Sequence, residues 1–306
     1  MVILLIILLI LLLLLALCEF LIHFALDSQA RWTLRRALYP PERLESEAKD
    51  PDMCWLMDSS REVLRTGRDG LRMSARLIPG EAPHRWIICC HGYCNAPTGT
   101  AIFARHFHAR GFTVLAPSLR AHADSEGRWI GMGWPDRLDL LEWTQWVLQQ
   151  DAAAEICWFG MSMGASTVCM AAGENPPPAV RCVISESAFT SVWDEYESQM
   201  RRVLHIPVGV LLWLIDRLAA PQTGWHLKEA STLEQVKKAS VPILFAHGGE
   251  DRFVPFTMLD VLYEACTSPV KEKLLIPGAG HCQGVRTDPQ TYWKVVDAFM
   301  DRVCAA

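Results

Sequence analysis

The chain begins with an apolar run unlike anything that follows it. Residues 2–17 are all Val, Ile, Leu or Ala, and apolar residues continue as far as Phe24, interrupted by Glu19 and His23. A helix that is apolar all round is not typical of the surface of a soluble domain, and about 20 helical residues span the hydrocarbon of a bilayer. Residues 1–25 are therefore predicted to form a transmembrane anchor.

From Glu62 onward, short β-rich apolar runs alternate with longer segments of helical pattern. Strands are expected at residues 62–66, 71–77, 86–90, 113–117, 155–159, 180–185, 241–246 and 273–276. Helices are expected at residues 100–110, 136–150, 165–173 and 288–303. Such alternation predicts an α/β domain with a mostly parallel sheet covered by helices on both faces. A glycine-rich turn at residues 67–70 joins the first two strands in a hairpin, which gives the sheet a mixed edge.

This pattern divides the chain into three parts. The anchor at residues 1–25 is followed by a polar approach segment at 26–60 and by the α/β domain at 61–306. Within the domain, the alternation breaks between residues 192 and 240. That stretch includes the apolar run 206–215, which is too short to span a membrane.

Composition narrows the classes of function. The net charge is −5, and no basic stretch is interleaved with aromatic residues, so nucleic-acid binding is not expected. Several of the eleven cysteines lie inside strand-like runs, where they resemble small buried hydrophobes. No two cysteines have C-x-x-C spacing, so neither a metal site nor a cofactor is expected. Cysteine usage of this kind is typical of a reducing compartment.

The candidate chemistry is centred on Gly160-Met161-Ser162-Met163-Gly164, which has the G-x-S-x-G pattern of a nucleophile elbow. A strand-like run precedes it and a short helical run follows. Glycines on both sides of the serine avoid side-chain clashes where strand and helix crowd together, and the serine takes a strained conformation between them. Ser162 is the predicted nucleophile. The alternative is an ordinary turn with a solvated serine.

A serine needs a base, and the base needs a group that orients it. In parallel sheets the site lies beyond the carboxyl ends of the strands. His281 follows the last predicted strand in a glycine-rich loop, and Asp251 follows the strand before it. We predict His281 as the base and Asp251 as its partner. Glu250, beside Asp251, and Glu186, at another strand end, remain alternative acids.

The reaction also needs two donors where negative charge develops on the substrate. One is expected to be the backbone N–H of Met163, directly after the serine. The other is expected to be the N–H of Tyr93, where Gly92 allows the backbone to turn. The adjacent His91 is expected to be a structural hydrogen-bonding residue rather than a second base.

Together these motifs resemble those of the α/β-hydrolase superfamily over residues 62–303. The segments that carry the resemblance are residues 91–93, 119–127, 131–137, 160–164, 247–255 and 278–281. The chain is most similar to serine-aminopeptidase-like and monoacylglycerol-lipase-like hydrolases, and to membrane-anchored bacterial hydrolases of unassigned substrate.

The resemblance implies an α/β-hydrolase fold, a Ser162, Asp251 and His281 triad, and an oxyanion hole formed by Tyr93 and Met163. One motif departs from the branch, which has Arg-Gly-His-Gly where this chain has alanine at 121 and 123. That departure leaves the shape of this loop open, but not the triad.

The resemblance also implies that residues 192–240 form a helical cap over the active site, because insertions at this point of the fold do so. The apolar residues of the cap could line an acyl pocket or rest on the bilayer beside the anchor. They could also belong to a helix that simply packs on the core.

The expected reaction is hydrolysis of a carboxylic ester, with lipid-derived esters as one candidate class, through an acyl-enzyme at Ser162. The alternatives are a serine peptidase or amidase acting on small substrates, and a membrane-tethered binding protein of the same fold. Arg31, Arg35 and Arg36 follow the anchor, and positive charge tends to remain cytoplasmic. The catalytic domain is thus expected on the cytoplasmic side, with an extracytoplasmic domain as the alternative. The sequence does not indicate an oligomeric state.

Overall fold

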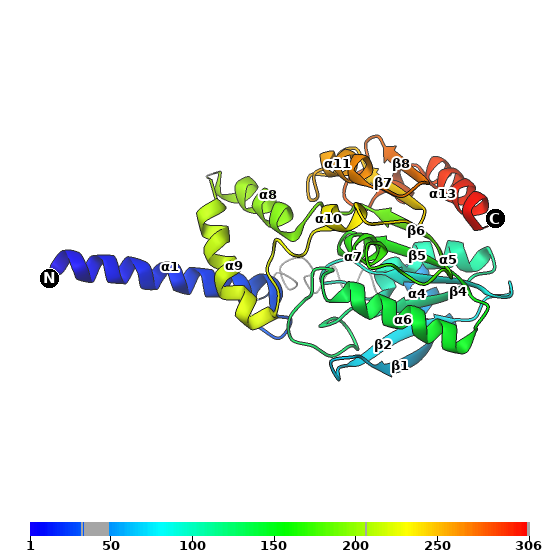
Figure 1. The fold of residues 1–306 in the computed structure, drawn as a ribbon, viewed down its shortest axis with the longest axis horizontal. Coiled ribbons are helices and arrows are strands. Elements are labelled where there is room, and N and C mark those ends of the chain that lie inside the picture. The colour runs from blue at the N-terminus through cyan, green and yellow to red at the C-terminus, as the bar shows by residue number, and fades with distance from the viewer. Residues whose placement is uncertain (32, 34–48, 206, 305–306) are drawn as a thin grey trace.

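The computed structural model describes residues 1–31, 33, 49–205 and 207–304 (Figure 1). Residues 32 and 34–48 of the predicted approach segment, which include Arg35 and Arg36, lie outside the described residues, as does residue 206 of the apolar run at 206–215.

An eight-stranded sheet runs through the domain in the order β1-β2-β4-β3-β5-β6-β7-β8. All eight strands lie where the pattern of apolar residues predicts them. The strands are β1 (Arg61–Thr66), β2 (Arg72–Ile78), β3 (Arg85–Cys90), β4 (Thr113–Pro117), β5 (Glu155–Met161), β6 (Val180–Glu186), β7 (Ile243–Gly248) and β8 (Lys271–Ile276). β1 and β2 form an antiparallel hairpin, β2 also pairs antiparallel with β4, and the remaining pairs are parallel. The predicted mixed edge is therefore present.

Helices cover both faces of this sheet (Figure 1). One face packs against α6 (Asp136–Gln150), α7 (Met163–Ala172), α10 (Thr232–Val236) and α11 (Thr257–Ala265). The other face packs against α4 (Pro51–Ser59), α5 (Ala101–Ala109), α12 (Gly284–Thr287) and α13 (Pro289–Cys304), and the short helix η1 (Pro97–Thr100) leads into α5. The central strands are buried on both sides, because each face carries its own layer of apolar side chains.

Two features lie outside this sandwich. Helix α1 (Val2–Leu26) protrudes from one end of the domain (Figure 1), and among the described residues it is the one helix long and apolar enough to cross a membrane. Between β6 and β7, the chain forms a hairpin of α8 (Val192–Leu204) and α9 (Gly209–Thr223). Helix α9 packs against α1.

Candidate active site

Ser162 lies on a strained turn between β5 and α7. Its backbone angles are φ 55° and ψ −120°, in a region that residues with a side chain seldom occupy. A Cβ atom on Gly160 would lie 2.1 Å from the carbonyl oxygen of Gly164, and one on Gly164 would lie 2.1 Å from that of Cys90. The two glycines are therefore required by packing as well as by the motif. The N–H of Ser162 donates to the carbonyl oxygen of Glu186 over 2.7 Å, which ties the turn to β6.

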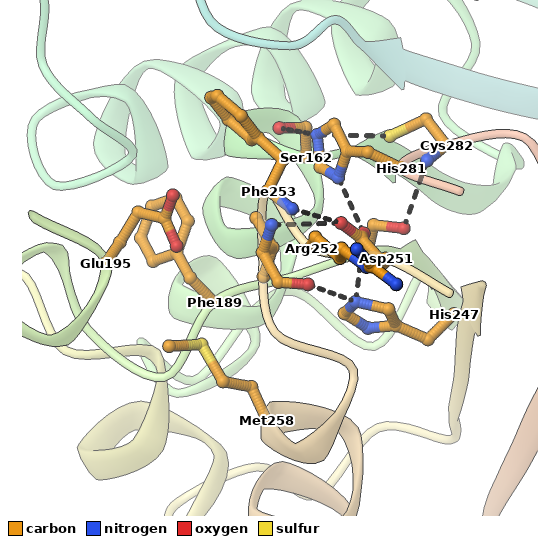
Figure 2. A network of polar contacts seen from close by, with 12 residues as sticks. Ser162, Phe189, Glu195, His247, Asp251, Arg252, Phe253, Met258, His281 and Cys282 are labelled. Carbon is orange, nitrogen blue, oxygen red and sulfur yellow. Dashed lines mark hydrogen bonds and ion pairs between the residues drawn. The ribbon is translucent and has the colours of Figure 1, made fainter. Parts of the chain in front are cut away.

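The structure brings the serine, the histidine and the acid together in one relay (Figure 2). The Oγ of Ser162 is 2.9 Å from Nε2 of His281. The Nδ1 of the same ring is 2.7 Å from Oδ2 of Asp251. Their loops follow β5, β8 and β7 respectively, so the rule that sites form at strand carboxyl ends locates all three residues.

The acid loop holds Asp251 as a carboxylate. The backbone N–H groups of Phe253 and Val254 donate to its Oδ1 over 2.9 and 3.0 Å, and Nε2 of His247 lies 3.2 Å from Oδ2. Burial alone would raise the pKa of Asp251, but hydrogen bonds from His247 and His281 outweigh it and place the pKa well below its ordinary value. Asp251 is thus a permanent acceptor that fixes the orientation of the His281 ring (Figure 2).

Neither alternative acid contacts this histidine. The side chain of Glu250 is 63% exposed and lies 3.9 Å from Arg252. The carboxyl group of Glu186 is buried behind the serine turn, and burial raises its pKa to about 7. Among the described residues, Asp251 is the acid that bonds to His281.

The two predicted oxyanion donors flank the serine. Met163 is the first residue of α7, where an N–H has no partner within the helix. Tyr93 lies in the loop after β3, directly after Gly92, on which a Cβ atom would approach the Cβ of Ser162 to 3.3 Å. Within the described part of the chain, neither N–H donates a hydrogen bond to a protein acceptor.

Two histidines hold the oxyanion loop in place. Nε2 of His91 accepts the N–H of Leu119 over 3.0 Å, and its Nδ1 donates to the carbonyl oxygen of Gly92 over 2.8 Å. His122 bonds in the same way, since its Nε2 accepts the N–H of Cys94 over 3.0 Å. His91 is therefore structural, as the sequence predicts. The positioning role of His122 is missed by sequence reasoning, although the motif that contains it is one of those that carry the resemblance.

The loop after β4, which contains His122, has alanine at the departing positions 121 and 123. Ala121 has φ 60° and Ala123 has φ 43°, both in the left-handed region where glycine is favoured. The loop therefore takes a conformation suited to glycine without having glycine there. The cost is local backbone strain at these two alanines.

A cavity of about 490 Å³ opens beside Ser162 and His281. Its lining combines the catalytic loops with apolar side chains from α4, α5 and α12. The lining residues are Asp50, Met53, Gly92, Tyr93, Asn95, Gly99, Ile102, Phe103, Met161, Ser162, Phe253, His281, Cys282, Gln283, Val285 and Arg286. None of the described residues of α8, α9 or α10 is among them, so the cap does not supply the walls of this cavity.

A cluster of three thiols lies away from the serine, toward the start of β5 and β6. The sulfur atoms of Cys157, Cys182 and Cys304 are within 4.8 Å of one another, although the spacing of the cysteines indicates no such group. Hydrogen bonds from the other two thiols, aided by Arg85 and Arg181, lower the pKa of Cys304. The same two guanidinium groups would repel a metal cation, so the cluster is a poor cation site.

Comparison with models of protein families gives a match over more than half of the chain. The model of the X-Pro dipeptidyl-peptidase (S15) family matches residues 42–215, more than half of the chain. The chain belongs to this family. This S15-family protein is also 26% identical over 228 residues to YqkD of Bacillus subtilis, a match that covers 74% of each chain.

Solved structures agree on the fold. The Pyrococcus furiosus esterase Pf2001 matches with a TM-score of 0.65 and 20% identity, over 80% of this chain and 91% of the esterase. The acylaminoacyl peptidase of Pyrococcus horikoshii matches with a TM-score of 0.59 and 16% identity, over 80% of this chain and 41% of the peptidase. The S15-family protein is therefore a hydrolase of the α/β type, which confirms the predicted superfamily and fold.

Proposed function

We propose that this protein is a serine hydrolase that cleaves carboxylic esters through an acyl-enzyme at Ser162. The observation that carries the proposal is the continuous relay from Ser162 through His281 to a buried, ionised Asp251. A non-catalytic binding protein would not need Ser162 to be held at positive φ with its hydroxyl hydrogen-bonded to the imidazole of His281.

In this mechanism His281 takes the proton of the Ser162 hydroxyl as the oxygen attacks the substrate carbonyl. The N–H groups of Tyr93 and Met163 receive the negative charge of the tetrahedral intermediate. His281 then donates its proton to the leaving alcohol. Water then attacks the acyl-enzyme by the same steps, with His281 as the base and then the acid. Asp251 stabilises the imidazolium during both acylation and deacylation.

Two features support an acyl group of apolar character. Ile102, Phe103, Met161 and Phe253 line the cavity beside the serine, and apolar walls favour an acyl chain over a charged one. Helix α1 has the length and composition of a membrane span, and we propose that it anchors the domain at a bilayer. Lipid-derived esters would be concentrated there. The cytoplasmic side remains our proposal for the domain, based on Arg31 and the arginines that follow it.

A second candidate is a peptidase acting on small substrates. The family model favours it, and the cavity carries Asp50 and Arg286, whose side chains form an ion pair at 3.4 Å. Such a pair can bind the charged ends of a short peptide. The relay would be unchanged, with His281 protonating an amine instead of an alcohol.

A fluorophosphonate probe tests the enzyme proposal on the full chain in detergent. Wild type should be labelled, and Ser162→Ala should not. Labelling of both proteins to the same extent would overturn the assignment of Ser162, and labelling of neither would overturn serine-hydrolase activity.

Substrate panels separate the two candidates. We expect turnover of p-nitrophenyl esters to rise with acyl length and to exceed that of aminoacyl and X-Pro anilides. Faster cleavage of the anilides, with a loss specific to anilides in Asp50→Asn, would favour the peptidase instead.

A further inference from the structure

The α8–α9 hairpin ends in a group of apolar side chains that contact little of the protein. Val203 is 70% exposed, Leu204 43%, Val210 77% and Trp213 50%. The other face of α9 is buried on the core through Leu212 and Ile215. We call the four exposed residues the cap tip.

The length of the exposed part of α1 indicates how far along this helix a bilayer must extend toward the domain. Residues 1–13 are all exposed, and 13 helical residues measure about 20 Å. The hydrocarbon of a bilayer is about 30 Å thick. A bilayer crossed by α1 therefore extends over the following turns, where Leu14 and Cys18 already pack on the domain.

Those turns lie against α9. The Nε2 of Gln222, near the C-terminal end of α9, donates to the carboxylate of Glu19 over 3.2 Å. From that end, α9 runs away from the sheet toward the α8–α9 turn, on the side from which α1 protrudes (Figure 1). The cap tip therefore lies at the depth at which α1 requires lipid.

The residues around the cap tip have the chemistry of a membrane interface. The guanidinium group of Arg217 lies 5.5 Å from the centre of the Trp213 ring. Tryptophan is enriched at headgroup level, and a long basic side chain can reach from apolar surroundings to the phosphates. Arg202, at the end of α8, is also exposed and adds positive charge beside the apolar residues, whereas the charge of the exposed Arg201 is balanced by Glu197 at 2.6 Å.

We propose that the cap tip inserts into the phospholipid bilayer that α1 spans, in the leaflet facing the domain. The inference rests on the proposed anchoring role of α1. It also gives the exposed apolar residues of the cap a contact partner, the lipid, since the described cap residues do not line the cavity. The domain would then be held at two points, with α1 as a pivot and the cap tip fixing its orientation on the membrane.

Photo-crosslinking in the full chain tests this proposal. The photoreactive residue p-benzoylphenylalanine would replace Val210, Ile10 in α1, or Leu64 on the edge strand β1, all of which are at least half exposed. Each variant is reconstituted in vesicles of phosphatidylcholine and phosphatidylglycerol, irradiated, and digested for mass spectrometry. We expect phospholipid adducts at positions 210 and 10, and none at 64.

The outcomes separate the two proposals. Adducts at position 10 but not at 210 would overturn the cap-tip proposal and leave the anchor intact. No adduct at either position would refute the anchor, and the cap-tip proposal with it. Adducts at 64 equal to those at 210, or crosslinks from 210 to a second protein chain, would refute insertion of the cap tip.

A charge placed at the cap tip gives a functional readout. For Val210→Glu we expect hydrolysis of a long-chain ester held in vesicles to fall by about tenfold, because a carboxylate is costly in hydrocarbon. Hydrolysis of soluble p-nitrophenyl acetate should be unchanged, and Leu64→Glu should affect neither. Equal losses on both substrates, or no loss on either, would contradict the proposal.

Discussion

The loops around Ser162 and the α8–α9 hairpin lie at the same end of the sheet but are stabilised in different ways. Around the serine, Cys94, Ser162, Ser187 and Cys282 all have positive φ, a concentration of strain that the surrounding hydrogen bonds maintain. Among the described residues of the hairpin, only His205 has a positive φ, and the outer side chains are exposed. The backbone of the serine region is thus held by contacts within the protein, whereas the outer surface of the hairpin is exposed and is the surface that we propose to contact lipid.

The largest expected effect is loss of the buried acid in the rigid region. Asp251→Asn removes the carboxylate that holds His281 in the required tautomer, and we expect kcat to fall by about 10⁴-fold. Steady-state hydrolysis of p-nitrophenyl acetate measures it.

The neighbouring Glu250→Gln is the matched control, because that side chain faces solvent. It should leave kcat within about twofold of wild type, in line with the small effects of surface substitutions. A loss in Glu250→Gln as large as that in Asp251→Asn would show that the wrong acid has been assigned.

The second prediction concerns Glu195 in α8, where the hairpin meets the acid loop (Figure 2). Its carboxyl group accepts from Gln199, whose side chain also donates to the carbonyl oxygen of Phe253. Burial raises the pKa of Glu195 to about 8, with Asp251 adding repulsion and Arg202 opposing the shift.

The sign follows from proton linkage. The folded protein holds the Glu195 proton more tightly than the unfolded chain does. The protonated carboxyl group therefore makes its full contribution to the free energy of unfolding below about pH 4.5, and this contribution is lost as the pH rises to about 8. Glu195→Gln should therefore gain about 2–4 kcal/mol of unfolding free energy relative to wild type between pH 5 and 8. Urea unfolding at both pH values measures this gain. Glu197→Gln, on the same helix, is the matched control, and an equal response in both variants would disprove the assignment.

Sequence reasoning located the strand-end region well because its signals are local. The G-x-S-x-G motif, the glycine loop before His281 and the acid after β7 each combine a strand end with a chemically competent residue. All eight strands follow from short β-rich runs in the same way. Helix α4 was missed, although Asp50 caps it by accepting the N–H of Asp52 over 2.9 Å and a proline follows at its first position.

Other features depend on contacts between distant parts of the chain. Cys157 and Cys304 are 147 residues apart, and their sulfur atoms lie 3.5 Å apart only because α13 ends beside β5. The orientation of the hairpin was left open for the same reason. It depends on the packing of α9 against α1, which no pattern within residues 192–240 specifies.

The third prediction tests a hydrogen bond between the loop that contains Tyr93 and α1, the helix against which the hairpin packs. The Tyr93 hydroxyl donates to the carbonyl oxygen of Ala25, so the end of α1 bonds to the residue whose N–H we assign to the oxyanion hole. For Tyr93→Phe we expect kcat to fall about threefold to tenfold with KM little changed, and stability to fall by about 1 kcal/mol. Tyr263→Phe on α11 is the control. Unchanged kcat in Tyr93→Phe would show that α1 does not position the loop.

The smallest effect concerns strain in the loop that supports the oxyanion residues. Ala121 has φ 60°, so Ala121→Gly removes an unfavourable Cβ contact at the cost of a more flexible unfolded chain. We expect a net gain of about 0.5–1 kcal/mol in urea unfolding. Ala265→Gly, at the end of helix α11, should lose about 1 kcal/mol, since glycine is unfavourable in a helix. The opposite signs make the pair informative: a loss at both positions would mean that the Ala121 conformation is not strained, and that the difference between the two regions does not extend to this loop.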